Sequence, residues 1–116
     1  MSAPDFDLQS HSLHSDGDLT PARVVANAAA AGVELLALSD HDTVDGVDEA
    51  LAAGALHGVR VVPATEISAV DGPYEDLHVL GYGIDHRSRL LNERLLDARA
   101  DRERRADAMA ARLNEL

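Results

Sequence analysis

The triplet Asp40-His41-Asp42 directly follows the apolar run Leu35–Leu38. Such a run predicts a strand buried on both faces, as in a parallel sheet. An acid, an imidazole and a second acid at the carboxyl end of this strand can bind a metal ion or transfer protons, and α/β folds keep their sites at this position. The alternative is a polar loop in which Asp42 caps the next helix, and the triplet alone does not decide between the two.

Further candidate ligands follow other predicted strands. His11 and Asp16 come after a short strand at the start of the chain, Glu66 ends a third strand and His78 lies in a fourth. Because the carboxyl ends of parallel strands meet at one rim, we expect these side chains to converge. The chain has no cysteine, so the ligands are nitrogen and oxygen atoms, which suit Zn, Mn or Fe. Two or three such divalent ions could support phosphoester hydrolysis, with Glu66 able to bridge two of them.

Each candidate ligand also has a structural explanation. His78 could be a hydrogen-bonded strand residue, Asp16 a turn residue and Glu66 a surface acid. The metal site is excluded only if every one of these explanations is correct at the same time. This requirement favours the metal site. His57 and His86 lie in predicted turns outside any motif, and we interpret both as surface residues. We assign no role to His14.

The composition excludes several classes of function. The 116 residues are 46% hydrophobic, 27% charged and 3% aromatic, with a net charge of −11 and only arginine as a basic residue. This acidity argues against electrostatic binding of duplex DNA and suits a cation site. No apolar run approaches the length of a membrane span, and the N-terminus lacks the pattern of a secretion signal. We therefore expect a cytoplasmic protein that does not bind membranes.

The sequence predicts helices and strands in α/β order. The expected elements are a strand at Phe6–Leu8, a helix at Ala22–Ala31 with Thr20 as its cap, a strand at Val33–Leu38, a helix from Val44 or Val47 to Leu56, strands at Arg60–Ile67 and Leu77–Ile84 separated by a turn at 71–73 and joined as a hairpin or by a crossover, and a long amphipathic helix from Ser88 onwards with Leu91, Leu95, Ala98, Met109 and Leu113 at helical spacing. A closed (β/α) barrel takes about 250 residues. We therefore expect 1–87 to be the N-terminal part of a barrel, and 88–116 to be a barrel helix or the start of an inserted helical subdomain.

The motifs resemble those of the PHP (polymerase and histidinol phosphatase) domain family. The family's opening pattern, Asp-Leu-His-x-His-Ser followed by Ser-Asp-Gly, is similar to residues 7–12 and 15–17 here. Its second motif resembles residues 39–43, its third residues 66–68, and its next histidine His78. The match looks closest to the stand-alone bacterial phosphoesterases that hydrolyse nucleotides or trim RNA from its 5′ end. The resemblance implies a distorted seven-stranded (β/α) barrel that binds up to three metal ions.

The resemblance also implies roles for individual residues. The metal ligands would be His11, Asp16, His41, Glu66 and His78, with Glu66 as the bridge. Asp40 and Asp42 would support these ligands from behind. Arg102 and Arg105 lie three residues apart on one helix face and would bind substrate phosphate. The alternative is a solvated helix face on which these arginines pair with neighbouring acids.

The chain departs from the family pattern in two respects. Gln9 stands where the pattern has the first histidine, and a neutral amide oxygen is a poorer ligand than imidazole for these metals. Gln9 is therefore a possible altered metal ligand. The family's late histidine and Asp-x-His ligands would come from strands beyond residue 116, so we expect this chain to be part of a longer enzyme.

These observations favour one function and leave alternatives. The first hypothesis is a metal-dependent phosphoesterase that hydrolyses a phosphate ester of a nucleotide or of an RNA 5′ end by a metal-bound hydroxide. The alternatives are a truncated, non-catalytic metal-binding PHP module and an enzyme similar to histidinol phosphatase. A half barrel also exposes apolar surface and strand edges, so we expect the isolated chain to self-associate.

Overall fold

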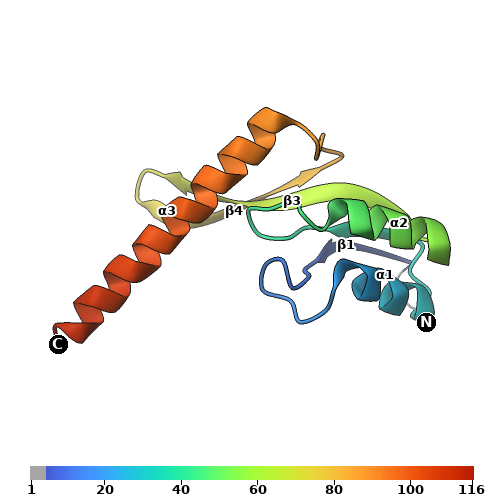
Figure 1. Cartoon of the computed structure of the whole chain (residues 1–116), viewed down its shortest axis with the longest axis horizontal. Helices are drawn as coiled ribbons and strands as arrows, with labels where there is room; N and C mark the ends of the chain where they lie inside the picture. The colour runs from blue at the N-terminus through green and yellow to red at the C-terminus, as the bar shows by residue number, and fades with distance from the viewer. Residues whose placement is uncertain (1–4) are drawn as a thin grey trace.

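The computed structural model describes residues 5–116, except for the side chains of 74–76. The elements are β1 (Phe6–Ser10), α1 (Pro21–Ala30), β2 (Leu35–Leu38), α2 (Val47–His57), β3 (Arg60–Asp71), β4 (Tyr74–Tyr82) and α3 (Arg89–Asn114). Within the described residues the strands form one sheet in the order β1-β2-β3-β4 (Figure 1). The predicted α/β fold is therefore confirmed.

The first three strands are parallel, and a helix connects each to the next. Thr20 caps α1 as predicted, because its Oγ1 accepts a hydrogen bond of 3.2 Å from the Arg23 backbone N–H. Gly58 ends α2 in the left-handed conformation (φ 73°), which glycine adopts without steric cost. These helix ends return the chain to the sheet, so that β1, β2 and β3 run in the same direction.

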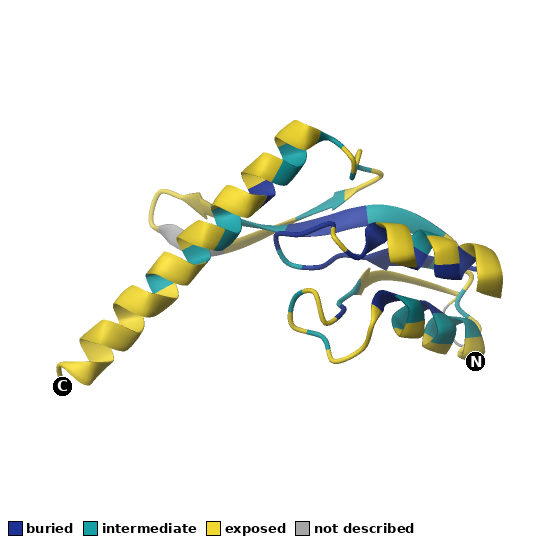
Figure 2. Cartoon of the chain, viewed as in Figure 1, coloured by how far each residue is buried: buried dark blue, intermediate teal, exposed yellow. Residues whose placement is uncertain are grey.

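The core lies between α1, α2 and the sheet. Its buried side chains are aliphatic, in keeping with the low aromatic content: Val25, Leu36, Leu38, Ala50, Ala53 and Val59. Figure 2 shows this burial concentrated in β2, in part of β3 and on the inner faces of the two helices. Full burial of each larger side chain stabilises the fold by roughly 1.5–3 kcal/mol. The core thus holds the strand ends that carry the candidate site.

The fourth strand runs antiparallel to β3. The sequence allowed a hairpin or a crossover between these two strands, and the structure has the hairpin. The hairpin is longer than predicted, since β3 continues to Asp71 rather than ending at Ile67. Tyr82 Oη donates a hydrogen bond of 2.7 Å to the Leu8 carbonyl oxygen, which joins β4 to β1. Because these are the two outer strands, the sheet must curl like part of a barrel.

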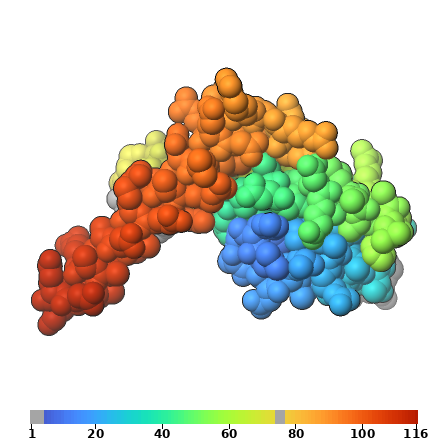
Figure 3. Space-filling view, viewed as in Figure 1, coloured from blue at the N-terminus to red at the C-terminus, as the bar shows by residue number. Residues whose placement is uncertain are grey.

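The long helix α3 contacts the body through its N-terminal half and through Arg102 near its middle. Leu95 is buried against Val44 and Val47, whereas every residue of 106–116 is exposed. The predicted apolar face therefore holds near Leu95 but not at Met109, which is 64% exposed. Figure 3 shows the C-terminal half of α3 extending away from the body. In the described part of the chain, no helix combines the length and apolar character that a membrane span requires.

Candidate metal centre

Two neighbouring strands place His41 and Glu66 side by side. The Glu66 N–H donates to the Asp40 carbonyl at 3.0 Å, and the Asp42 N–H donates to the Glu66 carbonyl at 2.9 Å. These bonds continue the parallel pairing of β2 and β3 beyond the end of β2, and His41 and Glu66 form a β-bridge there. The site therefore begins with two ligand-type residues fixed by backbone hydrogen bonds.

The loop after β1 carries His11 and Asp16, and buried Asp40 holds this loop. The Asp40 carboxylate accepts hydrogen bonds from the Ser12 N–H and Oγ, both at 2.6 Å, and from Ser15 Oγ at 2.8 Å. Gly17 is needed in the same loop, because a Cβ there would lie 2.4 Å from the His11 carbonyl oxygen. Asp40 thus lies behind the predicted ligands and supports the loop that presents them.

The five predicted ligands lie together. His41 Nε2 is 3.3 Å from Asp16 Oδ2, and His41 Nδ1 is 3.0 Å from Glu66 Oε2. His78 Nδ1 lies 3.2 Å from the same Glu66 oxygen, and His11 Nδ1 lies 3.5 Å from Asp16 Oδ1. The rings of His11 and His41 stack with their centroids 4.7 Å apart. Residues separated by up to 67 positions therefore meet at one rim, although His78 comes from the middle of an antiparallel strand rather than from a strand end.

The donor set fits divalent cations. Among the described residues, two groups each place three ligand atoms within 4.8 Å of one another. They are His11, Asp16 and His41, and His41, Glu66 and His78, so His41 belongs to both. The Nδ1 atoms of His11 and His41 are buried and make no hydrogen bond of regular geometry, although a carboxylate oxygen lies near each, and the Glu66 side chain is only 6% exposed. Imidazole nitrogens and carboxylate oxygens without thiolates suit Zn, Mn or Fe.

Gln9 also faces this centre. Its Nε2 donates a hydrogen bond of 2.9 Å to Glu66 Oε1. The amide therefore presents its nitrogen to the carboxylate, whereas a metal ligand would have to present its oxygen.

Asp42 connects the centre to α3. Its backbone is left-handed (φ 53°), its side chain is fully buried, and its Oδ1 accepts a hydrogen bond of 2.8 Å from the Ser68 N–H. Arg102 Nη1 lies 3.3 Å from Asp42 Oδ2, and Arg99 Nη1 donates to the Asp42 carbonyl at 2.6 Å. Asp42 does not cap α2, which begins after Gly46 and has no side-chain cap bond within the described residues. The helix-capping alternative is therefore wrong.

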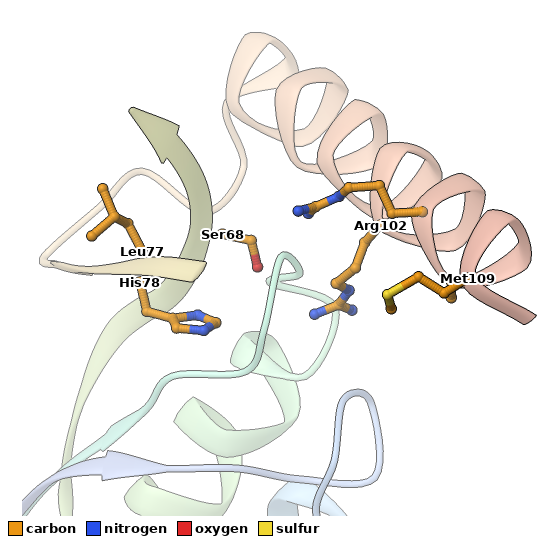
Figure 4. A pocket seen from close by; sticks show the side chains of 7 residues that line it. Ser68, Leu77, His78, Arg102 and Met109 are labelled. Atoms are coloured by element: carbon orange, nitrogen blue, oxygen red, sulfur yellow. The ribbon is translucent and has the colours of Figure 1, made fainter. Parts of the chain in front are cut away.

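Two adjoining cavities open beside the predicted ligands. One, of about 310 Å³, lies between the β3–β4 hairpin and α3 and is lined by Ser68, Leu77, His78, Arg102, Arg105, Ala106 and Met109 (Figure 4). The other, of about 420 Å³, is lined by Ser15, Asp16, His41, His78 and Arg102. Arg102 and His78 therefore line both cavities. Arg105 lines the first cavity, and its Nε lies 3.5 Å from Asp101 Oδ2. This ion pair agrees with the alternative in which the arginines of this helix pair with neighbouring acids.

The remaining histidines lie elsewhere. His14 and His57 are exposed. His86 is not a simple surface residue, because its side chain is 14% exposed and its Nε2 lies 2.8 Å from Asp48 Oδ1. Arg87 Nη2 contacts the same oxygen at 3.1 Å. The hydrogen bond with His86, reinforced by Arg87, lowers the pKa of Asp48.

Sequence reasoning missed three residues around the centre. Ser12 and Ser15 hold the loop through Asp40, and Arg99 binds the Asp42 backbone. Arg99 could have been found from its spacing, since it precedes Arg102 by three residues on the same helix face. Ser12 and Ser15 belong to the motif at residues 7–12 and 15–17, but the motif does not show that their partner is Asp40.

The family model of the PHP domain matches residues 7–114. The chain belongs to the PHP domain family. The resemblance identified from the motifs is thus confirmed, and the curled sheet is the N-terminal part of a PHP barrel.

Relatives of this PHP chain include named enzymes. A 3′,5′-nucleoside bisphosphate phosphatase of Chromobacterium violaceum is 42% identical over 93% of the chain and 38% of its own length. A 5′-3′ exoribonuclease of Haemophilus influenzae is 36% identical over 95% of the chain and 40% of its own length. The chain therefore spans about two fifths of the length of these relatives.

Solved structures share the same PHP architecture. An amidohydrolase from Chromobacterium violaceum, with sulfate bound and no metal, superposes with a TM-score of 0.87 at 40% identity, covering 97% of this chain and 39% of that one. A candidate metal-dependent phosphoesterase from Bifidobacterium adolescentis gives a TM-score of 0.84 at 34% identity, covering 95% and 38%. This chain therefore shares the fold of about two fifths of each of these proteins.

Proposed function

We propose that the protein is a metal-dependent phosphoesterase that hydrolyses a phosphate ester of a nucleotide or of an RNA 5′ end. The observation that carries the proposal is the meeting of three imidazoles and two carboxylates at one rim beside Arg102. The relatives named as a nucleoside bisphosphate phosphatase and an exoribonuclease support the choice of substrate.

His11 and Asp16 would contribute to one divalent-ion site, and Glu66 and His78 to a second. His41 belongs to both groups, and its neutral ring, with a single nitrogen lone pair, would complete one of them at a time. We propose Mn, Zn or Fe for these ions, and two or three ions in all. When bound, such ions supply Lewis acidity toward a phosphoryl oxygen and lower the pKa of a coordinated water. The protein itself fixes the ligands through the backbone bonds of Glu66 and the carboxylate of Asp40.

The arginines of α3 would bind the substrate phosphate. Arg102 lines both cavities, and Arg105 lines the one that extends along α3. A guanidinium can donate two parallel hydrogen bonds to a phosphate, which fixes its orientation and neutralises its charge. Arg102 would turn from Asp42 toward the phosphate, while Arg99 keeps α3 in place through the Asp42 carbonyl.

Activity assays of the protein with added manganese test this proposal. The substrates are a nucleoside 3′,5′-bisphosphate, a 5′-phosphorylated RNA oligonucleotide and histidinol phosphate. We expect His41→Ala to lower activity by about 100-fold or more, because it removes a ligand common to both groups. His57→Ala, at an exposed histidine, is the matched control and should retain activity. Equal activity of wild type and His41→Ala would refute the proposed centre, and turnover of histidinol phosphate alone would favour that alternative.

We also propose a division of the chain and a location for it. Residues 1–87 would belong to the barrel and 88–116 would begin a helical subdomain, which the exposure of 106–116 supports. The acidic, cysteine-free sequence supports a cytoplasmic location.

A further inference from the structure

Gln9 lies on β1 at the rim of the metal centre. We propose that its amide N–H takes the place of a metal ion at Glu66 Oε1, so that this chain binds fewer ions than its rim could otherwise hold. The inference rests on the proposed function, because it assumes that the rim binds metal.

The two oxygens of Glu66 face different partners. Oε2 lies 3.0 Å from His41 Nδ1 and 3.2 Å from His78 Nδ1, within one of the groups suited to a cation. Oε1 instead lies 2.9 Å from Gln9 Nε2 and 3.7 Å from His11 Nε2. Glu66 therefore presents one oxygen to a set of imidazoles and the other to an amide donor.

An amide nitrogen cannot ligate a metal ion, and it already satisfies Glu66 Oε1. An ion at this oxygen would sit at about 2.0–2.2 Å from it, in the space between the carboxylate, Gln9 and His11. Gln9 would have to give up a charge-assisted hydrogen bond and turn its carbonyl oxygen inward. A neutral amide oxygen returns less binding energy to Zn, Mn or Fe than an imidazole would. The hydrogen bond therefore excludes the ion.

Replacement of Gln9 by a true ligand should restore the missing ion. Gln9→His would add an imidazole beside His11 and Glu66 Oε1, and Gln9→Glu would add a carboxylate. Leu8→His is the matched control, because the Leu8 side chain is 37% exposed and lines neither cavity beside the centre. It introduces the same imidazole on the same strand, away from the metal centre.

The experiment measures manganese bound per chain by equilibrium dialysis and mass spectrometry, for the full chain and each variant, with circular dichroism to verify folding. We expect one further ion per chain in Gln9→His or Gln9→Glu, and the wild-type count in Leu8→His. A count in both Gln9 variants equal to that of wild type would overturn the role of Gln9 while leaving the proposed function intact. An equal gain in Leu8→His would overturn that role as well. Absence of bound manganese in every protein would overturn both proposals.

Discussion

The buried Asp40 carboxylate accepts two hydrogen bonds of 2.6 Å from Ser12, one from its backbone N–H and one from its hydroxyl. This contact joins the end of β2 to the loop that presents His11 and Asp16. The metal centre is therefore built on a contact between two residues that are not themselves ligands, and which lie 28 positions apart in the sequence.

Replacing Asp40 by alanine should destabilise both the fold and the ligand loop. The variant leaves the Ser12 N–H without its buried acceptor, and loss of such charge-assisted hydrogen bonds costs about 3 kcal/mol. Urea denaturation should therefore give a lower free energy of unfolding, and manganese should bind more weakly. Asp45→Ala is the control, because the Asp45 side chain is exposed and makes no ion pair within the described residues. Equal stability of the two variants would contradict the role of Asp40.

His41 belongs to both groups of ligand-type atoms, whereas His11 and His78 each belong to one. We therefore expect His41→Ala to weaken manganese binding at both groups, and His11→Ala or His78→Ala to weaken it at one. Isothermal titration calorimetry gives the number and affinity of the ions for each variant. If His41→Ala loses no more manganese binding than His78→Ala, His41 is not a ligand shared by the two groups.

Arg102 pairs with a carboxylate that is fully buried, yet its own side chain is 43% exposed. Arg102→Ala leaves the buried Asp42 Oδ2 without this partner, but water screens an exposed guanidinium, so the expected loss of stability is about 1 kcal/mol. Inorganic phosphate should also bind more weakly to the metal-loaded protein. Arg104→Ala, at a 70% exposed arginine that pairs with Asp101, should change neither quantity. An unchanged phosphate affinity in Arg102→Ala would argue against its role as a substrate ligand.

Asp48 ties the first turn of α2 to the turn before α3. Its pKa is lowered, first by the hydrogen bond with His86 and then by that with Arg87. A carboxyl whose pKa is lower in the folded state stabilises the fold above its unfolded pKa, and this stabilisation is lost as the pH falls through the folded value. Asp48→Asn should therefore be less stable than wild type at neutral pH, and the difference should shrink in acid, below about pH 4.

Urea denaturation across this pH range measures the difference. Asp45→Asn, at an exposed aspartate without an ion pair in the described residues, should show no such dependence. A difference in the free energy of unfolding between wild type and Asp48→Asn that stays the same in acid would exclude the ionised carboxylate as the cause of that difference.

Much of the fold and of the candidate site could be predicted from the sequence. The apolar run Leu35–Leu38 predicts a buried strand, which places the polar residues after it at a strand end. Thr20 followed by Pro21 fixes the start of α1 for a local reason. Both features depend on neighbours in the chain, and the structure has both.

The sequence could not predict features that depend on tertiary register. The turn at 71–73 allows either a hairpin or a longer crossover, and only pairing with β3 decides that His78 lies opposite Ser68. The direction of the Gln9 amide likewise depends on Glu66, which lies 57 residues away. The apolar spacing of α3 could not show that burial ends before Met109, because spacing does not reveal whether a partner surface exists.

The exposed apolar residues of the chain predict self-association. Leu113 is 68% exposed on α3 beside Met109, which is 64% exposed, and Phe6 on the outer strand β1 is 54% exposed. Exposed apolar surface and an open strand edge both favour contact between copies. Light scattering at rising concentration should show mass above that of a monomer, and Leu113→Lys should reduce it. Asn114→Lys, which adds the same charge at the exposed polar residue next to Leu113, is the matched control and should leave association unchanged. A monomer throughout the concentration range would show that these apolar surfaces are too weak to associate.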